Sequence, residues 1–187
     1  MKACSFSAKV FAVVVLLWVT AAQGATVEKM TLPQLSQSAQ AIVIGTITDV
    51  SYFQASDRNQ IYTRVTMDVR ESLKGSQSGT ISFTQLGGVI GDRRVSVSGF
   101  PVFVVDQELL LFLNDDPSGT ISTVGLGQGK FNVLVDQATG EKKVVNDVVG
   151  LEMVSDGLLV TSETISMSLA DMKKAVHESL NLREQRK

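Results

Sequence analysis

The chain has 187 residues, of which 44% are hydrophobic and only 6% aromatic, and its formal net charge is −2. This length suits one ordinary domain, and the hydrophobic content is sufficient for a packed core. The slightly negative charge and the scarcity of aromatic residues argue against nucleic acid as a partner, because neither a basic groove nor a stacking platform is present.

The first 24 residues have the pattern of a secretory signal peptide. Lys2 and Lys9 make a basic region, and an apolar run of about ten residues (VFAVVVLLWV) follows. The run is short for a membrane-spanning helix, which needs about 20 residues. Small residues follow, so we expect cleavage after Gly24 or Ala22 and no stable membrane insertion afterwards.

Cleavage would leave a secreted or periplasmic protein that has no cysteine. The only cysteine, Cys4, lies within the signal peptide. The mature chain would therefore have no disulfide, no cysteine-bound zinc and no thiol nucleophile. It would keep 15 of the 17 basic residues against 19 acidic ones, a net charge of −4.

Residues 25–40 form an N-terminal segment in which we expect a short helix. Thr31 suits the N-cap, and Pro33 falls in the first turn, where its missing N–H costs little. Leu32, Leu35 and Ala39 would share one face of this helix. The helix is expected to pack on the rest of the fold, either as a plug over core residues or as a lid that binds a partner.

A long hairpin over residues 41–75 is the central element that the sequence predicts. Ile42, Val43 and Ile44 are apolar in succession, which is typical of a strand buried on both faces. Gly45 is the expected bend. From residue 61 the pattern alternates with period two, as in a strand with one buried face. The side chains expected on that face are Ile61, Thr63, Val65, Met67, Val69 and Leu73.

Further short strands are expected along the rest of the chain. They cover residues 80–84, 108–113, 121–124, 131–135 and 142–145. The run ELLLFL at 108–113 reads as a strand buried on both faces. Residues 136–140 make a hairpin connection with glycine where a positive φ is needed.

The final element is expected to be a helix that begins near Ser168. Ser168 and Asp171 have the spacing of a capping box. An apolar stripe at helical spacing follows, made of Leu169, Met172, Val176 and Leu180.

Together these elements predict a mainly β fold. We expect a small OB-like β-barrel, closed or partly open, or a sandwich, with a short N-terminal helix and a C-terminal helix. The barrel would occupy residues 41–150, and residues 151–187 would form a C-terminal segment.

No stretch of the chain has a catalytic, metal-binding or cofactor-binding signature, so we predict no cofactor. Gly125–Lys130 (GLGQGK) fails the spacing of both phosphate-binding glycine motifs and reads as a glycine-kinked strand or crossover. His177, the only histidine, reads as a solvent-facing helix residue. Residues 114–116 offer too few oxygen ligands for calcium.

Several segments resemble a group of secreted bacterial proteins of uncharacterised function, which are often encoded near matrixin-type metalloproteases. The matching segments are IVIGTITDV, YTRVTMDVRESLKG, a Gly-Gly loop, ELLLFL and GLGQGKFNV, and they cover about residues 36–135. The hairpin is also similar in pattern to OB barrels of the netrin and metalloprotease-inhibitor class. Inhibitors of that class block zinc through an N-terminal cysteine, which the mature chain would lack.

Two glycine-containing loops are the expected partner-binding surface. Glycines allow close backbone approach, two apolar side chains offer anchors, and two arginines offer rim charge. The candidate residues are Gly87, Gly88, Val89, Ile90, Arg93 and Arg94. A second stretch, at 99–103, adds Phe100, Val102 and Phe103. These apolar residues would either contact a partner or pack under a neighbouring loop.

The hypothesis that follows is an exported, non-enzymatic module that binds another protein, such as a secreted protease, as its regulator or escort. One alternative is a hydrolase that uses carboxylates or a Ser/Lys pair. The other is a structural component of the cell surface or matrix, which would self-associate without a ligand.

We predict that the exported chain begins at Ala25 or Gln23 and carries no lipid. The intact mass of the protein recovered from the exporting cell tests this. A mass that retains the signal peptide, or one raised by acyl chains, would contradict it.

Overall fold

A computed structural model describes residues 26–55, 59–115, 121–148, 151–155, 157–161 and 163–184. The expected signal peptide and its cleavage sites lie outside the described residues, as do Asp116 and the middle of the first hairpin connection. Within the described ranges, no helix is long and apolar enough to cross a membrane.

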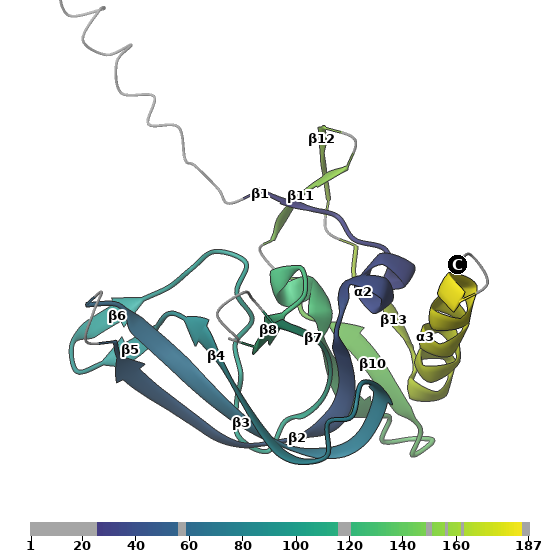
Figure 1. Cartoon of the computed structure of the whole chain (residues 1–187), viewed down its shortest axis with the longest axis horizontal. Coiled ribbons are helices and arrows are strands. Elements are labelled where there is room, and N and C mark those ends of the chain that lie inside the picture. The colour runs from purple at the N-terminus through teal and green to yellow at the C-terminus, as the bar shows by residue number, and fades with distance from the viewer. Residues whose placement is uncertain are drawn as a thin grey trace, which may run out of the picture.

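Strands dominate the described chain, and one helix stands near each end (Figure 1). The elements are β1 (Thr26–Glu28), α2 (Leu32–Ser38), β2 (Ala41–Gln54), β3 (Ile61–Lys74), β4 (Gly79–Leu86), β5 (Gly88–Ile90), β6 (Arg93–Val95), β7 (Glu108–Asp115), β8 (Ile121–Thr123), the 3-10 helix η1 (Leu126–Gly129), β9 (Lys130–Val135), β10 (Lys142–Asn146), β11 (Glu152–Ser155), β12 (Leu158–Val160), β13 (Ser166–Ser168) and α3 (Leu169–Glu184). The mainly β class and both terminal helices are therefore confirmed.

The main sheet is antiparallel and has the strand order β13-β10-β9-β7-β2-β3-β4, while β8 adds to β7. Three consecutive strands, β2, β3 and β4, lie side by side, and β7 returns next to β2. This order is that of a Greek key. The described residues form two smaller sheets. In the first, β1-β11-β12, strand β11 is parallel to β1 and antiparallel to β12, and the second is the hairpin β5-β6.

The expectation of a closed barrel is wrong. The sheet curls so that β8 lies close to β4, but no ladder joins these two strands in the part of the chain that the structure describes. The ladder of β8 with β7 is only three residues long, from Leu113↔Thr123 to Asp115↔Ile121. Such a short strand ends before it can bridge the two sides of the sheet.

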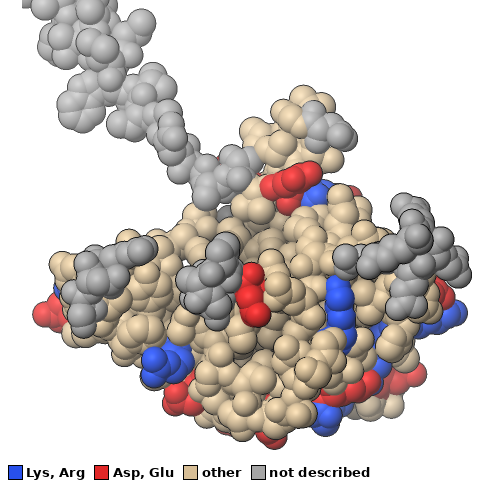
Figure 2. Space-filling model, in the orientation of Figure 1, with Lys and Arg blue, Asp and Glu red and all other residues tan. Residues whose placement is uncertain are grey.

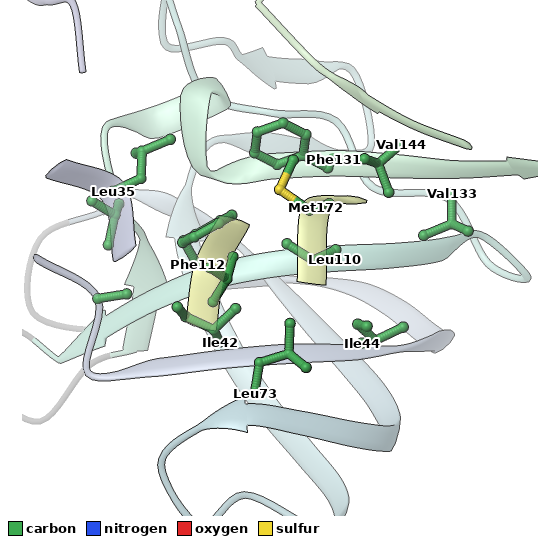
Figure 3. Packing of buried hydrophobic residues seen from close by; sticks show 13 residues of the cluster. Leu35, Ile42, Ile44, Leu73, Leu110, Phe112, Phe131, Val133, Val144 and Met172 are labelled. Carbon is green, nitrogen blue, oxygen red and sulfur yellow. The ribbon is translucent and has the colours of Figure 1, made fainter. Parts of the chain in front are cut away.

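Strands β2 and β7 are buried on both faces, as their continuous apolar runs indicate. Figure 3 shows the packing on the helix side of the sheet. The side chains that β2 and β7 place there are Ile42, Ile44, Leu110 and Phe112. Those on the opposite, inner face of the curl are Ala41, Val43, Leu109, Leu111 and Leu113. The core therefore has two layers with β2 and β7 between them.

The two helices cover one face of this sheet. Helix α2 begins at the N-cap Thr31, which forms a reciprocal capping box with Gln34, and it buries Leu35. At the start of α3, the Ser168 hydroxyl lies 2.7 Å from a carboxylate oxygen of Asp171. Both predicted helix starts are confirmed.

Bulges bend the long hairpin, and one of them changes the face of a predicted core residue. The register between β2 and β3 shifts at Ile44/Gly45 and twice more, and a Cβ at Gly45 would collide with the carbonyl of Asp68. The bend at Gly45 is therefore confirmed. Leu73 is buried as expected, but it joins the helix-side layer because each added residue reverses the alternation of side chains.

Val65 is fully buried on the inner face of the curl, so we predict that Val65→Asp will lower the free energy of unfolding by several kcal/mol. The carboxylate would be buried without a partner. Chemical denaturation of both proteins measures the loss. The exposed neighbour Arg64 gives a control, because Arg64→Asp should change stability much less. A near-normal midpoint for Val65→Asp would mean that the register of β3 is wrong.

Candidate functional site

Residues 96–107 cross from β6 to β7 and are called the strap. Several contacts hold it on the sheet, among them backbone hydrogen bonds of Asp106 and Gln107 with Ile47 of β2. The Gln85 side-chain amide donates to the Pro101 carbonyl at 2.8 Å, and the Lys130 ammonium donates to the Val102 carbonyl at 2.7 Å. Phe103 is buried and packs edge-to-face on Phe83, with ring centroids 5.2 Å apart. The strap is therefore fixed although it has no regular secondary structure.

Three valines of the strap face solvent. Val102 is 70% exposed, Val104 53% and Val105 44%. Apolar side chains scattered singly on a surface are ordinary, but clustered ones can mark a contact site. Here they form a ridge on a segment held from beneath, with one cavity on each side.

The first cavity, called the groove, has a volume of about 160 Å³ and lies between the β5–β6 hairpin and the strap. Its lining includes Tyr52, Val89, Arg94, Val97, Phe100 and Val102. The two loops that the sequence predicted as a partner-binding surface therefore lie next to each other. Phe103 also lines the groove, but it is buried and packs on Phe83 of the sheet rather than facing solvent.

Only some of the six nominated residues reach the groove. Gly87, Gly88, Val89 and Arg94 line it. Ile90 is half-buried and does not line it, and the Arg93 guanidinium instead lies 3.4 Å from both oxygens of Asn59. The stretch was expected to be a loop, but it forms the hairpin β5–β6. The signal that could have revealed it is the two-residue Gly91-Asp92 turn between β-forming residues.

Gly88 is required where the hairpin meets the main sheet. Its φ is +139°, and a Cβ there would collide with the ring of Tyr52. The glycine therefore lets the hairpin lie against β2 and β3, which closes one wall of the groove.

The second cavity has a volume of about 480 Å³ and is called the Lys130 cavity. It lies on the other side of the strap, and its lining includes Val104, Glu108, Lys130, Asn132, Leu134 and Asp147. Lys130 is only 2% exposed. Its ammonium pairs with Asp147 at 2.9 Å and lies 5.5 Å from the Phe103 ring centroid. Sequence reasoning missed this residue.

The glycine run before Lys130 is a packing device rather than a phosphate loop. Of the two expected forms, a glycine-kinked strand or a crossover, the kinked strand is not found, since the run forms the 3-10 helix η1 between β8 and β9. A Cβ at Gly127 would collide with the Asp147 carbonyl, and one at Gly129 with the Val124 carbonyl. The glycines therefore allow a tight turn of the chain, and this turn places Lys130 beneath the strap.

Three of the described residues that line the Lys130 cavity are acidic, and two of them, Glu108 and Asp147, are held in ion pairs, whereas Asp106 forms none within the described chain. Glu108 accepts hydrogen bonds from Arg70 and from Lys142, the latter at 2.7 Å. Burial, together with the nearby charges of Arg70 and Lys173, lowers the pKa of Lys142. The pairing of Glu108 and Asp147 leaves them poorly placed to act as free acids or bases.

The hairpin between β9 and β10 is held by a carboxylate. Asp136 accepts from Lys143 at 3.0 Å and from the backbone N–H groups of Ala138 and Thr139. These hydrogen bonds, the one from Lys143 being the largest effect, lower the pKa of Asp136 to about 2.

The described residues include no group of three or more His, Cys, Asp or Glu side chains placed to hold a metal ion. His177 is exposed on α3, as expected. Comparisons of the chain with family models, with curated proteins and with solved structures found no match.

Because Lys130 is buried, we predict that Asp147→Leu will lower the free energy of unfolding by about 3 kcal/mol, since it leaves an uncompensated buried charge. The double variant Lys130→Met/Asp147→Leu should recover most of that loss, because it removes both charges. Thermal melting of the three proteins tests this. Equal melting temperatures for the single and double variants would show that the pair is not coupled.

Proposed function

We propose that this protein is an exported, non-enzymatic module that binds another protein through the groove and the adjoining valine ridge. The observation that carries the proposal is the exposure of Val102, Val104 and Val105 on an anchored strap. Protein interfaces combine an apolar centre with a polar rim and use a few large anchors.

The composition of the groove suits such a contact. Val89 and Phe100 contribute apolar surface, while Tyr52, which is 48% exposed, and Arg94 stand among them. Tyrosine and arginine are enriched at protein interfaces. Figure 2 shows a broad uncharged area on this view of the molecule, with charged side chains mostly along the lower rim.

The anchoring of the strap also favours binding. A segment already fixed by Gln85 and Lys130 loses little conformational freedom when a partner docks, so less of the interaction energy is spent on ordering.

We also propose that the curled sheet is related to the OB fold. The Greek-key order β7-β2-β3-β4, with β8 close to β4, resembles a five-stranded barrel that stops short of closure. Barrels of this kind bind their ligands with loops and one open face, which is where the strap and the β5–β6 hairpin lie.

For the partner we propose a secreted protease, with this protein as its regulator or escort. The support is the resemblance of residues 36–135 to proteins encoded near matrixin-type metalloproteases. The pairing of Glu108 and Asp147 with cations favours binding over a hydrolase that uses these two carboxylates, because paired carboxylates are less able to exchange protons.

We predict that Val89→Ser will weaken capture of the partner tenfold or more, about 1.4 kcal/mol, with little change in melting temperature. Ile90→Ser is the matched control, because Ile90 is the next residue of β5 and is also half-buried, but does not line the groove. The mature protein and both variants are immobilised and exposed to culture medium from the native host. Captured proteins are identified by mass, and the affinity of each is then measured.

A partner that binds wild type and Ile90→Ser equally, but binds Val89→Ser weakly, would support the proposal. Lowered stability of Val89→Ser with unchanged affinity would show that Val89 is only a packing residue. Self-association of the pure protein, with no other protein captured, would favour the structural alternative.

A further inference from the structure

Strand β9 has one open edge beside the Lys130 cavity. Its ladder with β7 ends at Leu109↔Asn132, whereas its ladder with β10 continues to Val135↔Lys142. The chain leading into β7 turns away at Asp106, whose φ is +68°. Beyond the hydrogen bond that closes the ladder with β7, from the Val133 N–H to the Glu108 carbonyl, the end of β9 is therefore paired on the β10 side only.

The register shows which backbone groups face that open edge. The Asp136 N–H donates to the Glu141 carbonyl at 2.8 Å, and the Asp147 N–H donates to the Lys130 carbonyl at 3.0 Å. Backbone groups of a strand point to alternate sides with period two. Lys130, Asn132, Leu134 and Asp136 thus bond on the β10 side, and Val133 and Val135 face the other side. The Val133 N–H bonds to the Glu108 carbonyl, as the pair Leu109↔Asn132 requires. The groups left open are therefore the Val133 carbonyl and the N–H and C=O of Val135.

Side chains beside this edge also have unused hydrogen-bonding capacity. The Asn132 side-chain oxygen is buried and accepts no hydrogen bond from the described residues. Buried polar atoms usually have a partner, so each exception calls for an explanation. The Lys130 ammonium has three N–H donors, and the contacts within the described chain use two of them.

The walls of the cavity are apolar on either side of these groups. Val104 of the strap is 53% exposed and Leu134 of β9 is 54% exposed, and both line the cavity. Its volume of about 480 Å³ falls within the range of ligand sites, about 300–1,000 Å³.

We propose that the open edge of β9 and the Lys130 cavity bind an extended peptide segment of the partner protein as an added strand. The Val133 carbonyl and the N–H and C=O of Val135 would pair with the peptide main chain. A peptide N–H would donate to Asn132, a peptide carbonyl would accept from Lys130, and an apolar side chain would lie between Val104 and Leu134. Alternating donors and acceptors along an edge match a polypeptide main chain better than a small metabolite.

This inference rests on the proposed function in one respect, since it names the form in which a partner protein engages. It uses different residues from the groove, so the two ideas can fail separately. An edge of this kind can also pair with a second copy of the same chain, and the experiment below includes that outcome.

The probe is a phage-displayed library of random dodecapeptides, panned against the immobilised mature protein. Enriched peptides are synthesised, and their affinities are measured by fluorescence anisotropy. Val135→Pro removes one N–H from the open edge, a position that tolerates proline. We expect it to fold with a near-normal melting temperature and to bind the peptides at least tenfold more weakly. Leu134→Pro, the matched control, removes a ladder bond to β10 and should be strongly destabilised.

Asn132→Leu separates binding from stability. It replaces a buried acceptor that lacks a donor with an apolar side chain of similar size, so the melting temperature should rise by about 2–4 °C. Peptide affinity should fall, because the acceptor for the peptide N–H is lost. A purely structural Asn132 would not affect peptide affinity.

Amide hydrogen exchange checks the register directly. Peptide binding should slow the exchange of the Val135 amide, while the amides of Val133 and Leu134 are already protected by β7 and β10. No enrichment of peptides, or equal affinity of wild type and Val135→Pro, would overturn the inference. So would a dimer in sedimentation that Val135→Pro dissociates, since the edge would then serve a second copy. Val89→Ser should bind the peptides normally even where it loses the partner at the groove.

Discussion

Burial of β2 and β7 on both faces is the constraint on which the rest of the structure depends. These strands sit between the helix-side layer and the inner layer of the core. Helices α2 and α3 cover the outer face, and the curled sheet with Phe103 of the strap covers the inner face. The strap is held down because the inner layer would otherwise be open to water at that point.

The parts of the fold that the sequence predicted are those in which local pattern and tertiary environment agree. The apolar runs of β2 and β7, the alternation of β3 and the caps at Thr31 and Ser168 all depend on near neighbours in the chain. The strands β1, β11, β12 and β13 were not predicted, since each has only three or four residues and is defined by its pairing. The shift of Leu73 to the other layer arises from bulges that periodicity does not encode.

The candidate site was predictable in its location but not in its chemistry. The glycines and apolar residues of 87–94 and 99–103 indicated two surface loops, and these do share the groove. In the sequence, Lys130 stands out only as part of a phosphate-binding glycine motif, and the spacing of the run fails that motif. The burial of Lys130 depends on Asp147 and the Val102 carbonyl, which come from distant parts of the chain. A buried lysine is rare enough that only the packed structure reveals it.

The pairing of β1 with β11 imposes an order on folding. Thr26 pairs with Glu152 in parallel, and Gln128 holds the same N-terminal stretch by bonding to Glu28 and Met30. Strand β1 can therefore pair only after β11, which comes late in the chain, is in place. Such long-range contacts form slowly. Strand β1 therefore cannot complete its pairing until residues 152–154 are available.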